Sequence, residues 1–233
     1  MTMTRSVKRL AAVAAGAAAL CAFSAPARAE VLLSQLIVEL KEGAIAGDID
    51  VWNNSPERVY VAAEPREIVN PGTPAQADRK APDPEKLGLL VAPARMILEP
   101  GQHRRLRIAA IGPAAVSERV YRVTVRPEVG GVASEKSGLK ILVGYDVLVL
   151  VRPSGARAAV VGKRTAGGIT FTNQGNVSVE LTDGRQCDPA GKGCVALPGK
   201  RLYVGAEWTE PLKSAAPVQY RVISPGESDQ KVF

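Results

Sequence analysis

The sequence has few of the residues from which catalytic sites are usually built. It contains one histidine, His103, three cysteines and no G-x-S-x-G motif, so it lacks the common means of activating a nucleophile. Paired glycines such as 130–131 fall between predicted strands and not before helices, and are therefore turns and not phosphate-binding loops. A metal site would need more clustered ligands than the chain offers. We predict that the protein is not an enzyme and uses no cofactor, metal or small-molecule substrate.

The sequence also lacks an uncharged apolar run long enough to span a membrane. The nearest is residues 10–23, which follow three basic residues and precede the small-residue motif Ala-Arg-Ala at 27–29. This order is typical of a secretory signal peptide. We therefore predict a signal over residues 1–29 and an exported mature chain that begins at Glu30.

Excess positive charge is scarce once the signal is removed. The formal net charge is +7, but four of the 30 Lys and Arg residues lie in the predicted signal, and the remaining 26 against 23 acidic residues give +3. The densest basic run, residues 102–107, alternates like a strand with one solvent-exposed face. The sequence therefore predicts no nucleic-acid partner.

Two cysteines remain after the signal, Cys187 and Cys194. An isolated pair this close in sequence, in a chain exported to an oxidising compartment, predicts a disulfide. The residues between them, Asp-Pro-Ala-Gly-Lys-Gly, form turns readily and can close so short a loop.

The chain does contain a succession of short apolar or alternating runs bounded by Gly, Pro and Asn. Seven of them predict strands at the spacing of an immunoglobulin-like sandwich: 31–40, 47–53, 58–64, 89–98, 102–110, 119–129 and 139–151. Residues 70–88, which are rich in proline and charge, predict a long exposed loop.

The pattern restarts after Arg-Pro-Ser-Gly at 152–155, where further strands are predicted over 156–162, 168–173, 177–182, 200–205 and 218–223. No amphipathic helix intervenes. We therefore predict an all-β protein of two immunoglobulin-like β-sandwich domains, residues 30–152 and 156–233, joined by a short hinge with a cleft between them.

Of all the predicted strands, 139–151 has the most regular apolar alternation. Every odd position in it is apolar, and a proline two residues later ends the run. Period two places these side chains on one face of a strand. The predicted strand is long enough to cross its sheet and extend beyond it.

Four segments resemble the periplasmic chaperones of the chaperone–usher route of pilus assembly. Residues 90–108 (LVAPARMILEPGQHRRLRI) are similar to the family block P-x-x-x-x-L-x-P-G-Q…L-R-I, and 117–126 resemble its next strand. Residues 139–153 resemble the strand that ends its first domain, and 173–176 (NQGN) resemble a strand entry of its second. The cysteine loop and Leu-Pro-Gly-Lys at 197–200 are more similar to the alternate, or alpha-type, branch.

The resemblance implies a chaperone that binds and caps incomplete immunoglobulin-like pilus subunits in the periplasm by donor-strand complementation, and delivers them to an outer-membrane usher. The positions that match the donated side chains are Leu139, Ile141, Val143 and Tyr145. Whether the free chaperone covers this edge by dimerising stays open.

The resemblance also implies an interdomain ion pair between Glu118 and Arg152, with Glu210 as our candidate for a third, acidic member. Two positions depart from the family. Ile37 and Leu148 stand where the classical family has the Arg and Lys that hold the carboxylate at the subunit's C-terminus. A second function therefore stays open: a two-domain sandwich with no client, serving as a structural or adhesion component of a surface assembly.

Overall fold

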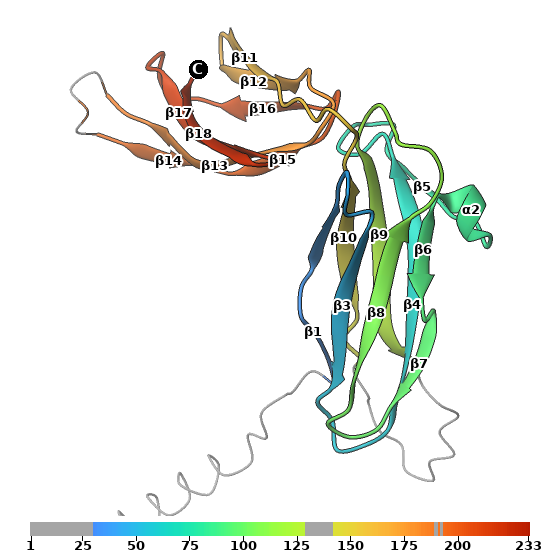
Figure 1. Ribbon diagram of the computed structural model, residues 1–233. Helices are drawn as coiled ribbons and strands as arrows, with labels where there is room; N and C mark the ends of the chain where they lie inside the picture. Colours follow the sequence, from blue (N-terminus) through green and yellow to red (C-terminus); the bar gives the residue numbers. More distant parts are fainter. Residues whose placement is uncertain (1–29, 129–141, 189–190, 192) are drawn as a thin grey trace, which may run out of the picture.

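The computed structural model describes residues 30–128, 142–188, 191 and 193–233 (Figure 1). The protein is all-β, as the sequence predicted, with two β-sandwiches that meet near the hinge so that the second lies across one end of the first (Figure 1). The predicted signal, 1–29, lies outside the described residues. Within the described part of the chain, no helix is long and apolar enough to cross a membrane.

The first sandwich consists of two sheets. One has the order β1 (Val31–Leu33), β3 (Ala46–Asn53), β8 (His103–Ala110), β6 (Leu89–Ala92). The other has the order β2 (Ile37–Leu40), β10 (Tyr145–Val151), β9 (Arg119–Glu128), β4 (Val59–Val69), β5 (Ala77–Arg79), and β7 (Arg95–Leu98) also pairs with β4.

The core of this sandwich follows from alternation along its strands. Ile49 on β3 and Leu106 on β8 from one sheet, and Val123 on β9 and Val147 on β10 from the other, are all completely buried. Successive side chains of a strand point to opposite faces, so one apolar residue in two suffices to fill the space between the sheets.

Two predicted strands are each divided in the structure. Residues 31–40 form β1 and β2, which belong to different sheets because the chain bends at 34–36 and crosses the sandwich. Residues 89–98 form β6 and β7, also in different sheets, on either side of a break that includes Pro93. Proline has no N–H to contribute to a ladder, which favours a break at this point.

The segment predicted as a loop, 70–88, contains β5 and the short helix α2 (Pro84–Leu87). It is tied to the sheet through Glu67 on β4, which accepts hydrogen bonds from Arg79 and, at 2.8 Å, from Arg119 Nε. Burial alone would raise the pKa of Glu67, but the hydrogen bonds from Arg119 and Arg79 outweigh it and hold the pKa below its usual value. The carboxylate therefore stays charged and anchors the segment.

The second sandwich also has two sheets. One has the order β11 (Val160–Thr165), β12 (Gly168–Asn173), β16 (Glu207–Pro211). The other has the order β14 (Val195–Leu197), β13 (Val179–Gln186), β17 (Val218–Ser224), β18 (Glu227–Val232), with β15 (Lys200–Leu202) also on β13. Aromatic rings fill its centre, where Phe171 packs against Trp208, Tyr220 and Phe233 with centroids 5.0–5.4 Å apart.

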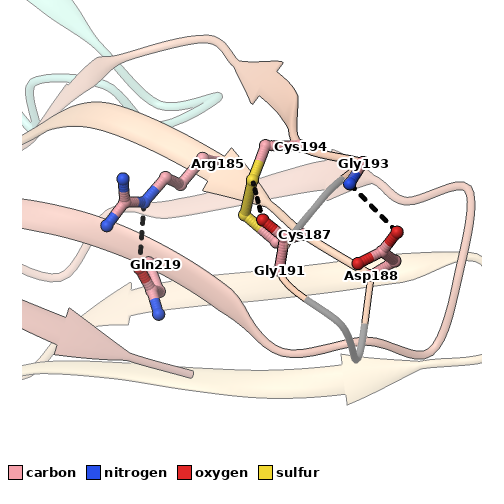
Figure 2. The surroundings of a disulfide bond; sticks show 7 residues. All are labelled: Arg185, Cys187, Asp188, Gly191, Gly193, Cys194 and Gln219. Atoms are coloured by element: carbon pink, nitrogen blue, oxygen red, sulfur yellow. Dashed lines mark hydrogen bonds between the residues drawn. A yellow bond between two sulfur atoms is a disulfide. The ribbon is translucent and has the colours of Figure 1, made fainter.

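Among the described strands, none from one sandwich belongs to a sheet of the other. At the end of β13 the structure joins Cys187 to Cys194 in a disulfide, and Gly193 donates its backbone N–H to Asp188 Oδ2 at 3.0 Å (Figure 2). No group of three or more His, Cys, Asp or Glu side chains in the described ranges could hold a metal ion.

Candidate functional site: an open strand edge beside the domain junction

One edge of β10 is only partly covered. On one side β9 pairs with β10 along its whole length, from Tyr145 to Val151. On the other side the parallel strand β2 begins its pairing at Leu148. Within the described part of the chain, Tyr145 to Val147 therefore have no strand on that side, because the preceding residues, β1, have crossed to the other sheet. An edge of this kind can accept a further strand through its backbone N–H and C=O groups.

The strand predicted over 139–151 is shorter in the structure, where β10 begins at Tyr145 and residues 142–144 are not in a strand. β2 pairs with β10 only from Leu148 onward, and β9 runs on to Glu128 without pairing with residues 142–144. The pairing of β9 with β10 stops at Val125, and two residues beyond lies Pro127, which cannot donate a hydrogen bond. Residues 142–144 therefore lie beside the end of β9 without a ladder that would hold them in a strand.

The four predicted donor residues fall into three different situations. Leu139 and Ile141 lie outside the described residues. Val143 is 49% exposed. Tyr145 is half-buried, packs against the core of the first sandwich and donates its hydroxyl hydrogen to the Val31 carbonyl at 2.8 Å. Tyr145 therefore marks the point where the apolar alternation enters the protein's own core.

Next to Tyr145, an ionic cluster around Asp146 holds the outer face of β10 in place. Asp146 accepts one hydrogen bond from each Nη of Arg66 on β4, both at 2.9 Å, and one from the Thr124 hydroxyl on β9 at 3.2 Å. The hydrogen bond to Asp146 is the main reason that the pKa of Arg66 is raised. This cluster links three strands and orients the start of β10.

Ile37 and Leu148, which match the classical Arg and Lys positions, lie directly opposite each other on β2 and β10. Leu148 is only 5% exposed and joins an apolar cluster with Ile68, Val120 and Leu150, against which Tyr203 of the second sandwich packs. These two positions cannot hold a carboxylate, because neither carries a charge or a hydrogen-bond donor on its side chain.

A cation does lie beside them, on the neighbouring strand. Arg122 on β9 is the register partner of Leu148, and its side chain is 34% exposed. Its Nη1 donates to the backbone carbonyl of Asp146 at 3.1 Å, while its Nε lies 3.8 Å from the Asp146 carboxylate. The guanidinium therefore keeps part of its surface and some of its donors available on this face.

The structure also joins Glu118 and Arg152 directly, with their side chains 0% and 5% exposed. The second acidic partner of Arg152 is Glu39 on β2, at 2.8 Å, and not Glu210, which lies on β16 opposite Ile169. Our candidate for the third member was therefore wrong. Arg152 is already paired inside its own sandwich, so no acid from the second is required.

The second sandwich contributes hydrogen-bond donors to this pair, which the sequence reasoning missed. Ser178 donates both its backbone N–H and its hydroxyl to Glu118 Oε2, each at 3.2 Å. Close by, Asn176 bonds to the first sandwich and to the hinge. The polar run at 173–178, NQGNVS, is a signal for such contacts, but the resemblance assigns it only to the entry of a strand.

A model of one protein family matches residues 30–157, and its description is "Pili and flagellar-assembly chaperone, PapD N-terminal domain". The match covers more than half of the chain, so the protein belongs to this family of chaperones. Family and fold are those of non-enzymatic pilus-assembly chaperones. No curated protein sequence matches the chain significantly.

Solved structures of chaperones share the two-domain fold. The class 5 fimbriae chaperone CfaA has a TM-score of 0.68 at 22% identity, with 87% of this chain and 98% of that chain covered. The Salmonella enterica chaperone–pilin structure of SafB with SafA gives 0.63 at 18% identity over 90% of this chain and 98% of that chain. A chaperone–tip adhesin complex of CFA/I fimbriae gives 0.66 at 22% identity over 88% and 98%. At these identities the likeness is one of fold.

Proposed function

We propose that the protein is a periplasmic chaperone that binds incomplete immunoglobulin-like pilus subunits by donor-strand complementation and delivers them to an outer-membrane usher. The observation that carries this proposal is the open edge of β10 at Tyr145 to Val147, preceded in the sequence by the apolar alternation of Leu139, Ile141 and Val143. The two domains of the chaperone are residues 30–152 and 156–233.

The physical basis is that a strand of the chaperone fills a groove that the incomplete subunit would otherwise expose. A sandwich that lacks its last strand exposes an apolar groove and unpaired backbone groups, both of which promote aggregation. A lent strand satisfies the backbone through main-chain hydrogen bonds, and its alternate apolar side chains fill the groove. Each fully buried Leu, Ile or Val side chain contributes roughly 1.5–3 kcal/mol.

Two further observations support the proposal. The family to which the chain belongs is one of pilus-assembly chaperones, and proteins of the same fold have been solved with a pilin and with a tip adhesin. The pattern at residues 1–29 is typical of a secretory signal, which is consistent with export to the periplasm.

The test is to mix the purified protein with a pilus subunit that lacks its last strand. We expect a stable one-to-one complex that keeps the subunit soluble, seen by light scattering after size-exclusion chromatography. The matched control is the same subunit with the missing strand fused to its own chain. Its groove is already filled, so it should not bind. A structural or adhesion component with no client would bind neither form, and that result would overturn the proposal.

We further propose that Arg122 takes over the anchoring of the subunit's C-terminal carboxylate. In the classical family an Arg and a Lys hold that group, and here their positions are the apolar neighbours Ile37 and Leu148. Arg122 lies opposite Leu148 with part of its guanidinium exposed. A carboxylate placed over the apolar pair would be within reach of this side chain, and arginine suits a carboxylate through its planar, forked set of donors.

The change Arg122→Gln should weaken subunit binding about tenfold or more, since charge-assisted hydrogen bonds contribute roughly 1.5–3 kcal/mol. Isothermal titration calorimetry would measure the loss. Arg105→Gln, which removes an exposed charge from the other sheet, should change little. A subunit with an amidated C-terminus should bind both variants and the wild type alike. If Arg122→Gln binds the free-acid subunit as tightly as the wild type, Arg122 is not the anchor.

A further inference from the structure

The turn at 173–178 in the second sandwich lies against both the first sandwich and the hinge. Asn173 opens this turn and is used within its own sandwich, where its Nδ2 donates to the Val177 and Leu202 carbonyls. Asn176, three residues later, is used differently. Some of its contacts reach the first sandwich and the hinge.

Asn176 makes five hydrogen bonds at the junction. Its Nδ2 donates to the carbonyls of Val116, in the first sandwich, and of Gly155, in the hinge, each at 3.3 Å. Its Oδ1 accepts from the Arg157 N–H at 2.6 Å. Its backbone N–H donates to the Arg157 carbonyl at 3.0 Å, and its carbonyl accepts from the Glu118 N–H at 2.8 Å.

These bonds fix the three parts of the junction to one residue. Val116 and Glu118 precede β9 of the first sandwich, and Gly155 lies in the hinge. Arg157 precedes β11 and Asn176 precedes β13, both in the second sandwich. A short asparagine side chain has little freedom, and its amide satisfies donors and acceptors on both sides at once. Neighbouring contacts act on the same boundary, including Ser178 with Glu118 and Tyr203 with the cluster around Leu148.

We propose that Asn176 is a positioning residue that locks the orientation of the second sandwich relative to the first. The lock matters for the proposed chaperone, because one pocket at the junction is lined by Val204 of the second sandwich together with residues of the first, among them Ile68 and Val120. A fixed angle presents the open edge of β10 and the second sandwich to a client as one preformed surface, which lowers the entropy lost on binding.

The variant Asn176→Asp tests this with little change in shape. Aspartate keeps the oxygen that accepts from Arg157 but replaces the donating amide with a second carboxylate oxygen, which would face the carbonyls of Val116 and Gly155. The matched control is Gln174→Glu. It introduces the same charge two residues away, on an exposed side chain.

The measurement is of backbone residual dipolar couplings in the free protein, fitted separately for each sandwich. One alignment tensor should fit both sandwiches of the wild type and of Gln174→Glu. In Asn176→Asp the common tensor should be lost, while amide shifts in each core stay unchanged. This readout needs no client, so it is independent of the donor role. A donor-edge variant such as Val143→Asp should keep the common tensor even where it loses its client.

A common tensor in Asn176→Asp would overturn the proposal. If that variant does not fold, Asn176→Ala, which adds no charge, replaces it in the same measurement, and retention of the common tensor there would also overturn the proposal. Loss of the common tensor in Gln174→Glu would likewise count against it, because the effect would then come from charge alone.

Discussion

Replacing Val143 with aspartate is expected to abolish subunit binding while leaving the chaperone folded. Val143 is 49% exposed and lies outside the strand, so the change should alter the stability of the first sandwich by no more than about 0.5 kcal/mol. In the subunit's groove the same carboxylate would be buried without a partner, at a cost of several kcal/mol. Binding should therefore fall by roughly 100-fold or more. Ile141→Asp is expected to behave in the same way.

The matched control is Val147→Asp. Val147 continues the same alternation on the same strand, but it is completely buried in the core of the first sandwich. A charge there should unfold that sandwich, so that binding is lost only together with the fold. Thermal melting beside co-purification with the subunit separates the two cases. A Val143→Asp protein that melts normally and still retains the subunit would exclude this side chain as a donor contact.

Removing the Glu118 side chain is expected to destabilise the protein by about 3 kcal/mol. The carboxylate is 0% exposed, and its partner Arg152 is 5% exposed. Breaking a buried pair on one side leaves an uncompensated charge, which typically costs about 3–5 kcal/mol. We expect the lower end of that range, because Arg152 keeps Glu39 as a partner. Ser178, however, would lose its acceptor for two hydrogen bonds.

The comparison is with an ion pair that is exposed. Glu64 and Arg126 are 2.9 Å apart, with both side chains about half exposed. Glu64→Ala should cost only about 0–1 kcal/mol. Urea unfolding followed by tryptophan fluorescence can measure both variants, because Trp52 lies in the first sandwich and Trp208 in the second. Equal effects of Glu118→Ala and Glu64→Ala would show that burial does not set the strength of the Glu118 pair.

Much of the fold was predictable because apolar and polar residues alternate along strands that bury one face. β3, β8 and β17 were predicted nearly to their ends, since one residue in two must be apolar to enter the core. β18 was missed for the converse reason. Every one of its residues is exposed, and its sequence ESDQKV carries no apolar face from which a strand could be inferred. Among the described strands, β18 pairs only with β17.

The site was predictable only at positions that match the family residue by residue. The contact of Glu118 with Arg152 was anticipated by resemblance, whereas Glu39 and Ser178, the partners that complete the group, come from β2 and from the turn before β13. No periodicity connects these positions. The alternation through Leu139 to Val149 likewise could not show where exposure ends and burial begins, because that boundary depends on which neighbouring strands are present.

The bend at 34–36 determines how much of β10 is left open. On one side of the bend, Ser34 is bonded to Asp50 of the first sheet, and on the other, Leu36 accepts the Leu148 N–H of the second sheet. Because β2 and β10 run parallel, a crossing two residues later along the chain would leave two more residues of β10 uncovered. Lengthening or shortening the segment before the bend would therefore change, residue by residue, how much of the β10 edge is open. The side chains of the proposed donor segment would not change.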